Sequence, residues 1–450
     1  MAQLISRLSL PEAVGLSLAV ISPTVTAAFN ITLLVQAAGP AAPLTFAIGM
    51  VAMALVALSF MAFTRRVPHA GSAYAYVAHT FGRRMGFVAG WTLLLTYIGF
   101  STGFAALVGS FTSAALRGFG IDVSGLWLVI GAASMVVAWW LAYRDMRLSG
   151  RLMLILEAIA LIGIVALCVL ILRQVRPSVG QTLTTFRPSK DFGGWSGLGF
   201  GMVFSILCFA GFEGAATLGE ETVNPRRNIP IALLGTVIFS GIFFAFVAYC
   251  EVLGYGLSGL GDLAKSPAPL DDLAVRYAST RLAIGLDLAA AISCFSGLLG
   301  GIAASGRVLF ALGRAGLSSR LAHVHPTHGT PAVALSWVSV LVIAPFLCWA
   351  PFGKAGDYYS YTSTIAVLAL ILVYIGVCGA EFIEARRDQR LMWSLVCIVS
   401  SALLLWVLYR NLYPVPAYPN NLWPYFALIW VAISWLVMNL RPAVKGANPS

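Results

Sequence analysis

A glutamate interrupts one of the most apolar stretches of this 450-residue chain. Glu213 lies between Gly211 and Gly214 in CFAGFEGAATLGEETVNPRRNIP, residues 208–230, with apolar or glycine-rich runs on both sides. A carboxylate within a membrane helix is energetically costly and therefore indicates a functional site. Glycines beside it weaken the helix and free backbone groups that can bind a polar solute. The stretch predicts a solute or coupling site inside a membrane.

A second apolar stretch carries an interruption of another kind. Residues 22–26 read Ser-Pro-Thr-Val-Thr, and Pro23 both lacks a backbone N–H and clashes with the preceding helical turn. A kink absorbed by neighbouring helices would explain either interruption alone. Two interruptions at matching places in two halves of a chain instead favour a shared binding site.

The composition shows what kind of structure must hold these two interruptions. Hydrophobic residues make up 59% of the chain, charged residues make up 10%, and the mean hydropathy is +0.88. Soluble domains carry roughly a quarter charged residues. Apolar runs long enough to cross about 30 Å of hydrocarbon as helices recur along the chain. The sequence predicts an all-α polytopic membrane protein rather than a barrel of short alternating strands.

Twelve membrane-spanning helices are predicted. Their approximate ranges are 11–37, 41–63, 86–116, 124–143, 150–172, 195–219, 229–252, 283–313, 331–350, 357–380, 391–409 and 424–440. The interruptions fall near the middles of the first and sixth spans. Two five-helix units that each open with a broken helix have opposite orientations because five is odd, which is typical of inverted-repeat transporters.

The expected organisation follows from these spans. Residues 1–172 form the first repeat, 173–194 an outer loop, 195–380 the second, inverted repeat, and 381–450 two further helices with a cytoplasmic tail. The first segment is expected to be retained as a transmembrane helix, because no convincing cleavage site follows it.

The charge pattern predicts the orientation. The formal net charge is +11, but the basic residues lie in short loops between apolar runs rather than in a patch with interleaved aromatics, so no nucleic acid partner is expected. If the N-terminus is cytoplasmic, the inner loops carry more Lys and Arg than the outer ones. We therefore expect a multi-pass protein of the cytoplasmic membrane with both termini inside. Seven cysteines in apolar segments, without CxxC spacing, indicate core residues.

Three stretches resemble the amino acid/polyamine/organocation permeases. Residues 209–213, FAGFE, with the following Glu-Glu and Asn-Pro-Arg-Arg, are similar to that family's sixth helix and next loop. Residues 68–91 resemble its second loop and the start of its third helix, and residues 306–331 resemble the end of helix 8 and the loop to helix 9. The resemblance covers about residues 10–440 and implies a leucine-transporter-type fold with a ten-helix core and two added helices.

The resemblance also implies roles for the two breaks. The helix 1 break would offer N–H groups to a substrate carboxylate, while helix 6 carbonyls would receive the amino group. Phe209 and Phe212 would be gating aromatics, and Glu213 would bond across the bundle or change protonation during transport. The substrate-binding residues implied are Ser22, Pro23, Thr24, Val25, Thr26, Cys208, Phe209, Ala210, Gly211 and Phe212, with Gly301 on helix 8.

The chain also departs from the family pattern. Pro23 cannot donate a hydrogen bond, which weakens backbone capture of a carboxylate, although the hydroxyls of the three neighbouring Ser and Thr residues could substitute. Some proton-coupled relatives carry a lysine in helix 5, whereas Ala160 stands near that position here and the lysine mechanism does not transfer. Glu157 is the charge in this stretch: a proton carrier, a partner for a cation, or a side chain reaching water at the helix end. Gly301 replaces the tryptophan of arginine exchangers, which implies a roomier pocket or another sandwiching group.

The coupling ion stays open between a proton, sodium and pure exchange. Ser293, Ser296 and Ser305 on helix 8 are tentative sodium ligands, but each could instead bond its own helix backbone. At the inner end of helix 6, Glu220 and Glu221 precede Arg226 and Arg227 by one to two turns, and we expect an ionic inner latch in which Glu221 and Arg226 take part. No metal cofactor or other cofactor is expected.

These patterns favour one function over two others. The preferred function is a secondary active transporter, a symporter or exchanger that moves an amino acid by alternating access. The alternative is a transporter of the same fold for a polyamine or other organic cation. A membrane enzyme or receptor is disfavoured because residues 99–103, GFSTG, match a hydrolase G-x-S-x-G pattern only within a continuous apolar helix.

Overall fold

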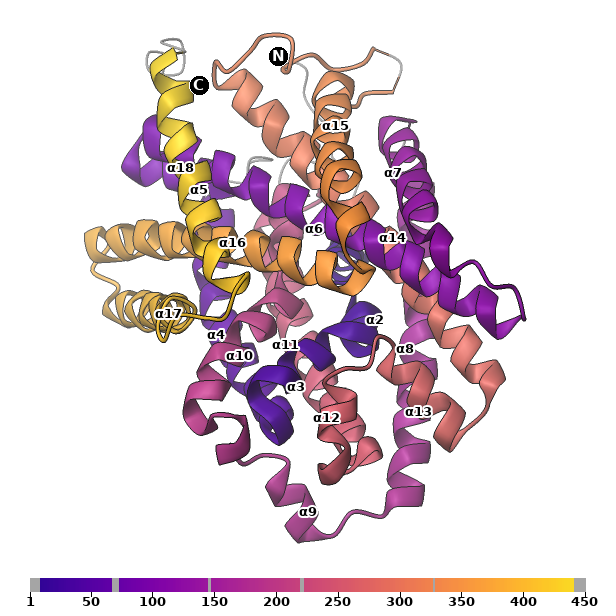
Figure 1. Ribbon diagram of the computed structural model, residues 1–450. Coiled ribbons are helices and arrows are strands. Elements are labelled where there is room, and N and C mark those ends of the chain that lie inside the picture. Colours follow the sequence, from indigo (N-terminus) through magenta and orange to yellow (C-terminus); the bar gives the residue numbers. More distant parts are fainter. Residues whose placement is uncertain (1–8, 67–72, 145–146, 219–221, 327, 441–450) are drawn as a thin grey trace.

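The computed structural model describes residues 9–66, 73–144, 147–218, 222–326 and 328–440, and within these ranges every regular element is a helix. Figure 1 shows long helices packed around a centre in which the shorter α2 and α3 lie beside α10 and α11. This arrangement confirms the all-α fold class that the hydropathy pattern predicts.

The long helices form most of the structure. They are α4 (Ala42–Arg66), α6 (Arg83–Gly118), α7 (Trp127–Arg144), α8 (Arg147–Val175), α10 (Gly194–Phe209), α11 (Pro225–Tyr255), α14 (Thr280–Arg314), α15 (Ala332–Trp349), α16 (Ala355–Arg387), α17 (Leu391–Arg410) and α18 (Trp423–Leu440). The shorter elements are α1 (Leu10–Ile21), α2 (Pro23–Val25), η1 (Thr26–Asn30), α3 (Ile31–Ala38), η2 (Gly39–Ala41), α5 (Ala73–Phe81), η5 (Phe212–Leu218), α9 (Val179–Thr184), α12 (Leu260–Leu263) and α13 (Pro269–Tyr277).

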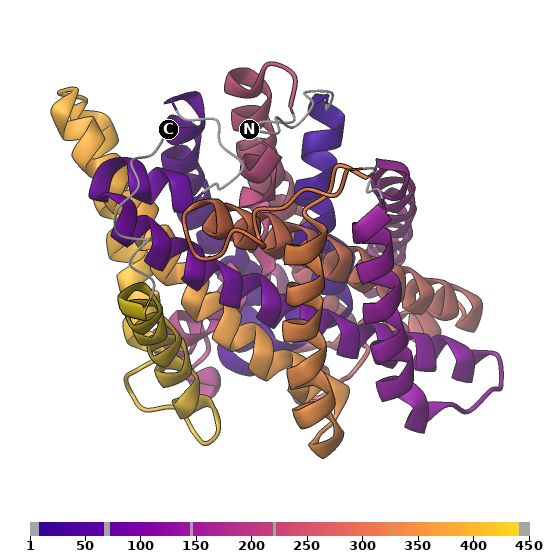
Figure 2. The same ribbon diagram turned by 90° about the horizontal axis from the view of Figure 1, so that it is seen from above.

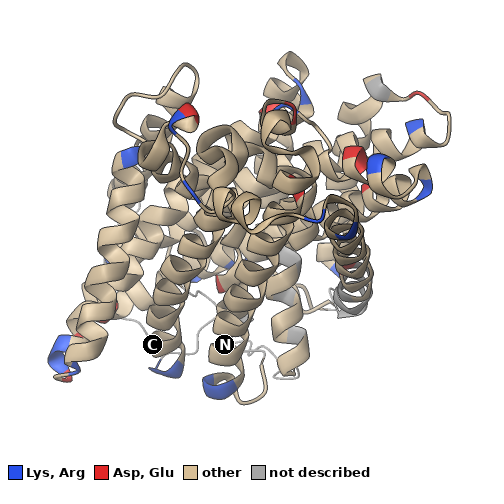
Figure 3. Cartoon of the chain, turned by 90° about the horizontal axis from the view of Figure 1, so that it is seen from below, with Lys and Arg blue, Asp and Glu red and all other residues tan. Residues whose placement is uncertain are grey.

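Eleven helical stretches among the described residues are apolar and long enough to cross a membrane. One of them, Pro23–Arg66, contains the turn η2, where Gly39 has a φ of 57°. The twelve-span count and the division into inverted repeats stay predictions. Figure 3 shows Lys and Arg mostly at helix ends and in loops, as expected when helix middles face hydrocarbon.

The first predicted interruption separates α1 from α2. Ser22 adopts a left-handed conformation with a φ of 50° and a ψ of 68°, and Pro23 then opens α2 at the position where its missing N–H costs least. After three residues the chain continues into the π-helical turn η1 and then into α3. Helix 1 is therefore broken at the residue before the proline.

The second predicted interruption separates α10 from η5. Ala210 leaves the helical region with a ψ of 131°, and Gly211 follows with a φ of 105°. A residue with a Cβ would be strained at this φ, so the glycine permits the break. The chain resumes as the tighter 3-10 helix η5 instead of returning directly to an α-helix.

Small residues bring the central helices into close contact. On α6, Gly99 and Gly103 face α16, where a Cβ at Gly103 would lie 2.7 Å from the hydroxyl of Thr362. On α11, Gly241 lies against Met50 of α4. Figure 2 shows α6 crossing the bundle beside α14 and α16. Such small-residue contacts position helices in membranes, where apolar burial contributes little to association.

Candidate solute site at two helix breaks

A single hydroxyl joins the two broken helices. Ser17 of α1 donates to the backbone carbonyl of Phe212 at 3.0 Å and accepts from the backbone N–H of Ala215 at 3.2 Å. Both partners belong to η5, and Ser17 is fully buried. The interrupted parts of the first and sixth spans therefore lie against each other.

Glu213 is buried and bonded from three directions. The Tyr97 hydroxyl of α6 donates to Oε1 at 3.1 Å, and the Tyr374 hydroxyl of α16 donates to Oε2 at 2.7 Å. The backbone N–H of Gly211 donates to Oε2 at 3.1 Å. The Glu213 carboxyl group thus connects the break between α10 and η5, in the sixth predicted span, to the long helices α6 and α16. This is the hydrogen bonding across the bundle that was expected of Glu213.

Glu157 of α8 reaches the other break. Its Oε1 accepts from the Thr24 backbone N–H at 2.9 Å and from the Thr24 hydroxyl at 2.8 Å. The residue is 6% exposed, which contradicts the alternative in which its head reaches water. Glu157 occupies the place at which a substrate carboxylate was expected to meet the backbone.

The remaining N–H groups at the helix 1 break are also engaged. Those of Val25 and Thr26 both donate to the Ser22 carbonyl, at 3.0 Å and 3.3 Å, and Pro23 has none. The Ser22 hydroxyl donates to the Ser293 carbonyl of α14 at 3.2 Å. In this conformation, the break between Ser22 and Thr26 holds its donors within the protein.

Unpartnered polar atoms collect around the breaks. Thr26 and Asn30 lie beside the Cys208 thiol, and Asn30 and Ser363 lie beside the Tyr359 hydroxyl. Ser293 lies beside Glu157. Five buried oxygens of this part of the molecule make no well-formed hydrogen bond within the described part of the chain: Thr26 Oγ1, Asn30 Oδ1, Ser293 Oγ, Ser296 Oγ and Ser363 Oγ. Thr26, Asn30, Ser293 and Ser363 thus each lie close to a polar neighbour without a well-formed hydrogen bond to it, so the breaks hold a group of buried polar side chains whose hydrogen-bonding capacity is not fully used.

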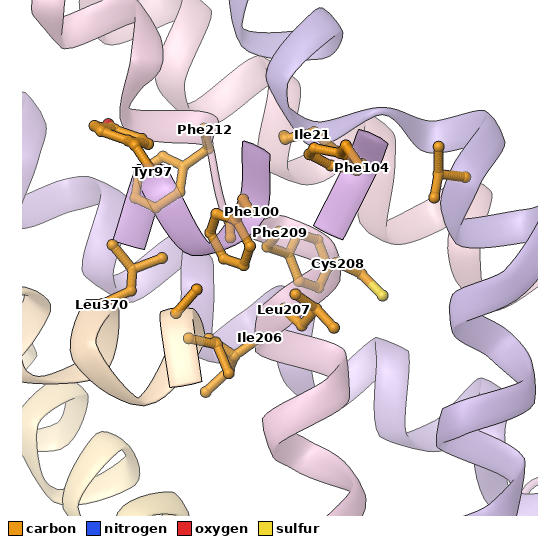
Figure 4. Packing of buried hydrophobic residues seen from close by; sticks show 14 of the residues in the cluster. Ile21, Tyr97, Phe100, Phe104, Ile206, Leu207, Cys208, Phe209, Phe212 and Leu370 are labelled. Carbon is orange, nitrogen blue, oxygen red and sulfur yellow. The ribbon is translucent and has the colours of Figure 1, made fainter. Parts of the chain in front are cut away.

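Aromatic rings close the region. Figure 4 shows Phe100, Phe209 and Phe212 gathered beside the helix 6 break, with Phe104 next to Ile21 at the helix 1 break. Phe209 and Phe212 are both fully buried. Phe212 also packs against the Tyr374 ring with centroids 5.6 Å apart. The two predicted gating aromatics therefore lie at the break, and both are closed off from solvent.

Two glycines of α14, the eighth predicted span, face different neighbours. Gly301 faces α6, where an added Cβ would collide with the Ser101 hydroxyl and lie 3.5 Å from the Tyr97 carbonyl oxygen, so it is a packing contact. One turn earlier, a Cβ at Gly297 would lie 2.8 Å from the Ser22 hydroxyl and 2.7 Å from the Phe104 ring. Gly297 therefore faces the helix 1 break, while Gly301 faces α6 and its part in substrate binding stays a prediction.

The three tentative sodium ligands do not all lie together: Ser305 differs from Ser293 and Ser296 in its hydrogen bonding and its position along α14. Ser293 and Ser296 have hydroxyls without partners among the described residues. Ser305 donates to the Gly301 carbonyl at 2.6 Å, and it lies nine residues, or about 14 Å of helix, beyond Ser296. Ser305 therefore cannot share an ion with the other two.

Two other predicted sites lie elsewhere. Ser101 of the G-x-S-x-G pattern donates to the Tyr97 carbonyl at 2.7 Å within continuous helix α6, without the strand and turn of a nucleophile elbow. Glu220 and Glu221 of the expected inner latch lie outside the described residues. Arg226 lies at the start of α11 and is exposed.

Sequence reasoning missed several residues at the breaks. Tyr97 and Tyr374 hold Glu213, while Asn30, Tyr359 and Ser363 belong to the group around Thr26. Buried tyrosines usually find a partner for their hydroxyl, and this preference is the signal that could have indicated them. Glu251 of α11 was missed as well: it is 1% exposed, and neither carboxyl oxygen has a hydrogen-bond partner among the described residues.

Two interrupted helices, joined inside an all-helical bundle and surrounded by unpaired polar atoms, define a multi-pass membrane transporter of the leucine-transporter fold class. Residues 8–433 match the amino acid permease family, and the chain belongs to this family. This membership confirms the resemblance found in the sequence. It also places the chain among permeases.

Individual relatives agree with this assignment. The chain is 25% identical over 344 residues to the branched-chain amino acid permease BcaP of Lactococcus lactis subsp. cremoris, covering 72% of this chain and 73% of the relative. It is 25% identical over 407 residues to the low-affinity putrescine importer PlaP of Escherichia coli K12, covering 87% and 85%. A manganese transporter structure from Eremococcus coleocola has a similar fold, with a TM-score of 0.57, 11% identity, and coverage of 97% of this chain and 95% of that one.

Proposed function

We propose that this permease moves an amine-bearing organic solute, with an amino acid as the first candidate, by alternating access around the two breaks. The observation that carries the proposal is the group of buried polar side chains at the breaks, Thr26, Asn30, Ser293 and Ser363, whose oxygens make no well-formed hydrogen bond among the described residues. A solute that satisfied these atoms would recover much of the free energy lost by burying them, about 1–3 kcal/mol for each group.

The charge of the region supports an amine. The described residues at the breaks include two buried carboxyl groups, Glu157 and Glu213, and none of the site residues named above is basic. Free carbonyls at the end of a broken helix carry partial negative charge. An ammonium group therefore finds a favourable electrostatic environment between α10 and η5, as the resemblance to the permeases implies.

A specific observation favours the second candidate, an amine without a carboxylate. The Thr24 N–H, which would meet a substrate carboxylate, is bonded to Glu157, and the neighbouring donors are bonded to Ser22. Under this alternative, the Glu157 side chain supplies the carboxyl group that an amino acid would otherwise bring. The name of the relative PlaP, a putrescine importer, is in keeping with such a solute.

A transport experiment separates the two candidates. Protein in proteoliposomes is given labelled leucine and its decarboxylated counterpart 3-methylbutylamine, and separately ornithine and putrescine. An amino acid transporter takes up only the carboxylated member of a pair, whereas an amine transporter takes up the decarboxylated member. Failure to transport or exchange either member of both pairs would contradict the proposal for amine-bearing solutes.

The same preparation tests the site. Ser363→Ala and Asn30→Ala should each weaken solute-dependent thermal stabilisation, because each removes one atom that the solute would satisfy. The matched control is Ser134→Ala on α7, whose hydroxyl donates to the Gly131 carbonyl of its own helix. Equal loss of stabilisation in the control would place the solute elsewhere.

The coupling ion and orientation complete the proposal. Ser293 and Ser296 are the candidate sodium ligands, and Glu157 is the candidate proton carrier. Thermal stabilisation by solute, measured with and without sodium at two pH values, distinguishes sodium coupling, proton coupling and exchange. The excess of Lys and Arg in alternate loops supports insertion in the cytoplasmic membrane with both termini inside.

A further inference from the structure

An open groove lies between the end of α4 and the beginning of α11, away from the two breaks. Its volume is about 520 Å³, within the range of roughly 300–1,000 Å³ that small-molecule sites occupy. These two helix ends lie side by side in Figure 2, at the top of the view. We call this feature the α4/α11 groove.

One end of the α4/α11 groove is strongly basic. Arg65 comes from the last turn of α4, and Arg226 and Arg227 come from the first turn of α11. All three are exposed, and no acidic side chain lines the groove among the described residues. The neighbouring Arg66 differs, because it pairs with Asp388 at 2.6 Å and with Glu384 at 3.5 Å.

The helix start adds to this positive charge. α11 is 31 residues long, and its N-terminal end carries the positive pole of its macrodipole. Arginines near a helix N-terminus are electrostatically unfavourable unless an anion lies nearby. Arg226 and Arg227 at the start of α11, with Arg65 beside them, therefore form a site at which an anion would relieve mutual repulsion.

The rest of the groove is apolar and follows α11 away from the arginines. Ile231, Leu234 and Ile238 line it, and Ile231 and Ile238 are 47% and 42% exposed. Ile238 lies eleven residues after Arg227, or about 16 Å of helix, which is close to half of a hydrocarbon core about 30 Å thick. The groove is thus long enough to extend from a head group at the arginines to about half the thickness of the hydrocarbon core.

We propose that the α4/α11 groove binds one anionic phospholipid, with its phosphate at the three arginines and an acyl chain along the apolar wall. A phosphate accepts charge-assisted hydrogen bonds from arginine. Basic pockets between membrane helices are suited to acidic head groups, and the apolar extension requires a ligand that carries a hydrocarbon chain. A soluble phosphate compound matches the first part of the groove only.

Native mass spectrometry of delipidated protein tests the proposal by titration with phosphatidylglycerol and with phosphatidylcholine of the same chains. We expect one tightly bound phosphatidylglycerol and weaker phosphatidylcholine binding. The variant R65Q/R226Q/R227Q should lose affinity for phosphatidylglycerol by about fivefold for each charge removed. The control R84Q/R320Q/R386Q removes three exposed charges that do not line the groove and should bind as the wild type does.

A second variant tests the apolar part with all charges kept. Gly235 lines the groove, and a Cβ added there meets no atom within 4 Å, so Gly235→Trp can fold while filling the space for the acyl chain. Thermal unfolding verifies the fold, and Gly235→Leu serves if the tryptophan variant is unstable. We expect loss of phosphatidylglycerol binding.

Several results would overturn this inference. Equal binding of the two lipids, equal loss in the control triple variant, or full binding by a folded Gly235 variant would each contradict a specific site. Competition by glycerol 3-phosphate as effective as that by the lipid would show that the arginines bind soluble phosphates instead. None of these measurements depends on which solute the permease carries.

Discussion

The backbone N–H of Thr24 in α2 donates to the side-chain carboxyl group of Glu157 in α8 across 2.9 Å. The Thr24 hydroxyl donates to the same oxygen at 2.8 Å. A carboxylate of the protein therefore occupies the position that a substrate carboxylate would take at a helix break. The proposed function therefore predicts that the chemistry at residue 157 governs substrate choice.

Removing the Glu157 side chain should shift preference toward amino acids. Glu157→Ala leaves the Thr24 N–H without its partner, so a substrate carboxylate can accept from it. A hydrogen bond to a charged group contributes about 1.5–3 kcal/mol, and we expect the affinity ratio of amino acid to matched amine to rise by about tenfold or more. Competition assays in proteoliposomes measure this ratio.

The conservative variant Glu157→Gln provides the control. Its amide oxygen can still accept from Thr24, so the N–H stays occupied while the charge is lost. We expect weaker amine binding without the gain for amino acids. An equal fall of both affinities in Glu157→Ala would contradict the assigned role.

Loss of the Tyr374 hydroxyl should destabilise the folded protein. Tyr374→Phe removes the 2.7 Å bond to Glu213 Oε2 and leaves a buried carboxyl group with fewer donors. The expected cost is about 1.5–3 kcal/mol, measured by reversible denaturation in mixed detergent micelles. Tyr425→Phe removes a hydroxyl from a 59% exposed side chain and should cost little. If both variants lowered the free energy of unfolding by a similar amount, the hydrogen bond from Tyr374 to Glu213 would not contribute to stability.

Gly301→Ala should destabilise the contact between α14 and α6, and Ser101→Ala should restore it. The added Cβ collides with the Ser101 hydroxyl, and overpacking a close contact typically costs about 1–3 kcal/mol. Without that hydroxyl, the nearest remaining atoms lie 3.5 Å away. A double-mutant cycle on thermal stability measures the coupling. Additive costs would show that these two residues are not in contact.

Replacing Glu251 with an apolar residue should stabilise the protein. Both of its carboxyl oxygens are buried without partners among the described residues. Such an unpaired polar group costs about 1–3 kcal/mol, which Glu251→Met should recover. Thermal unfolding in detergent measures the gain, and uptake assays show whether transport survives. A fall in stability would reveal a partner that Glu251 needs.

The sequence was sufficient to locate the two breaks, because each depends on local backbone chemistry. Pro23 cannot continue a helix, and Gly211 permits a φ that other residues resist. The partners of Glu213 were not predictable in this way. Tyr97 and Tyr374 are 116 and 161 residues distant from it in sequence, and local periodicity does not show which faces of distant helices meet.

Two positions on α14, the eighth predicted span, also show that the sequence alone does not indicate which neighbour a helical residue faces. Gly297 and Gly301 are one turn apart and nearly equivalent by composition, yet one faces Ser22 and the other faces Ser101. Helix rotation and depth are determined by packing against neighbouring helices. Glu157 is a similar case, because a shift of a few ångströms along α8 separates a solvated carboxylate from one bonded to Thr24.

The two hydrogen bonds made by the Ser17 hydroxyl have a mechanical consequence. The Ser17 hydroxyl is bonded to both the Phe212 carbonyl and the Ala215 N–H. Therefore α1 and η5, which belong to the first and sixth predicted spans, cannot separate here without breaking both hydrogen bonds. A half-open state with one helix displaced alone is therefore disfavoured. This one small side chain therefore links the displacement of α1 to that of η5, so that the two segments move as one mechanical unit.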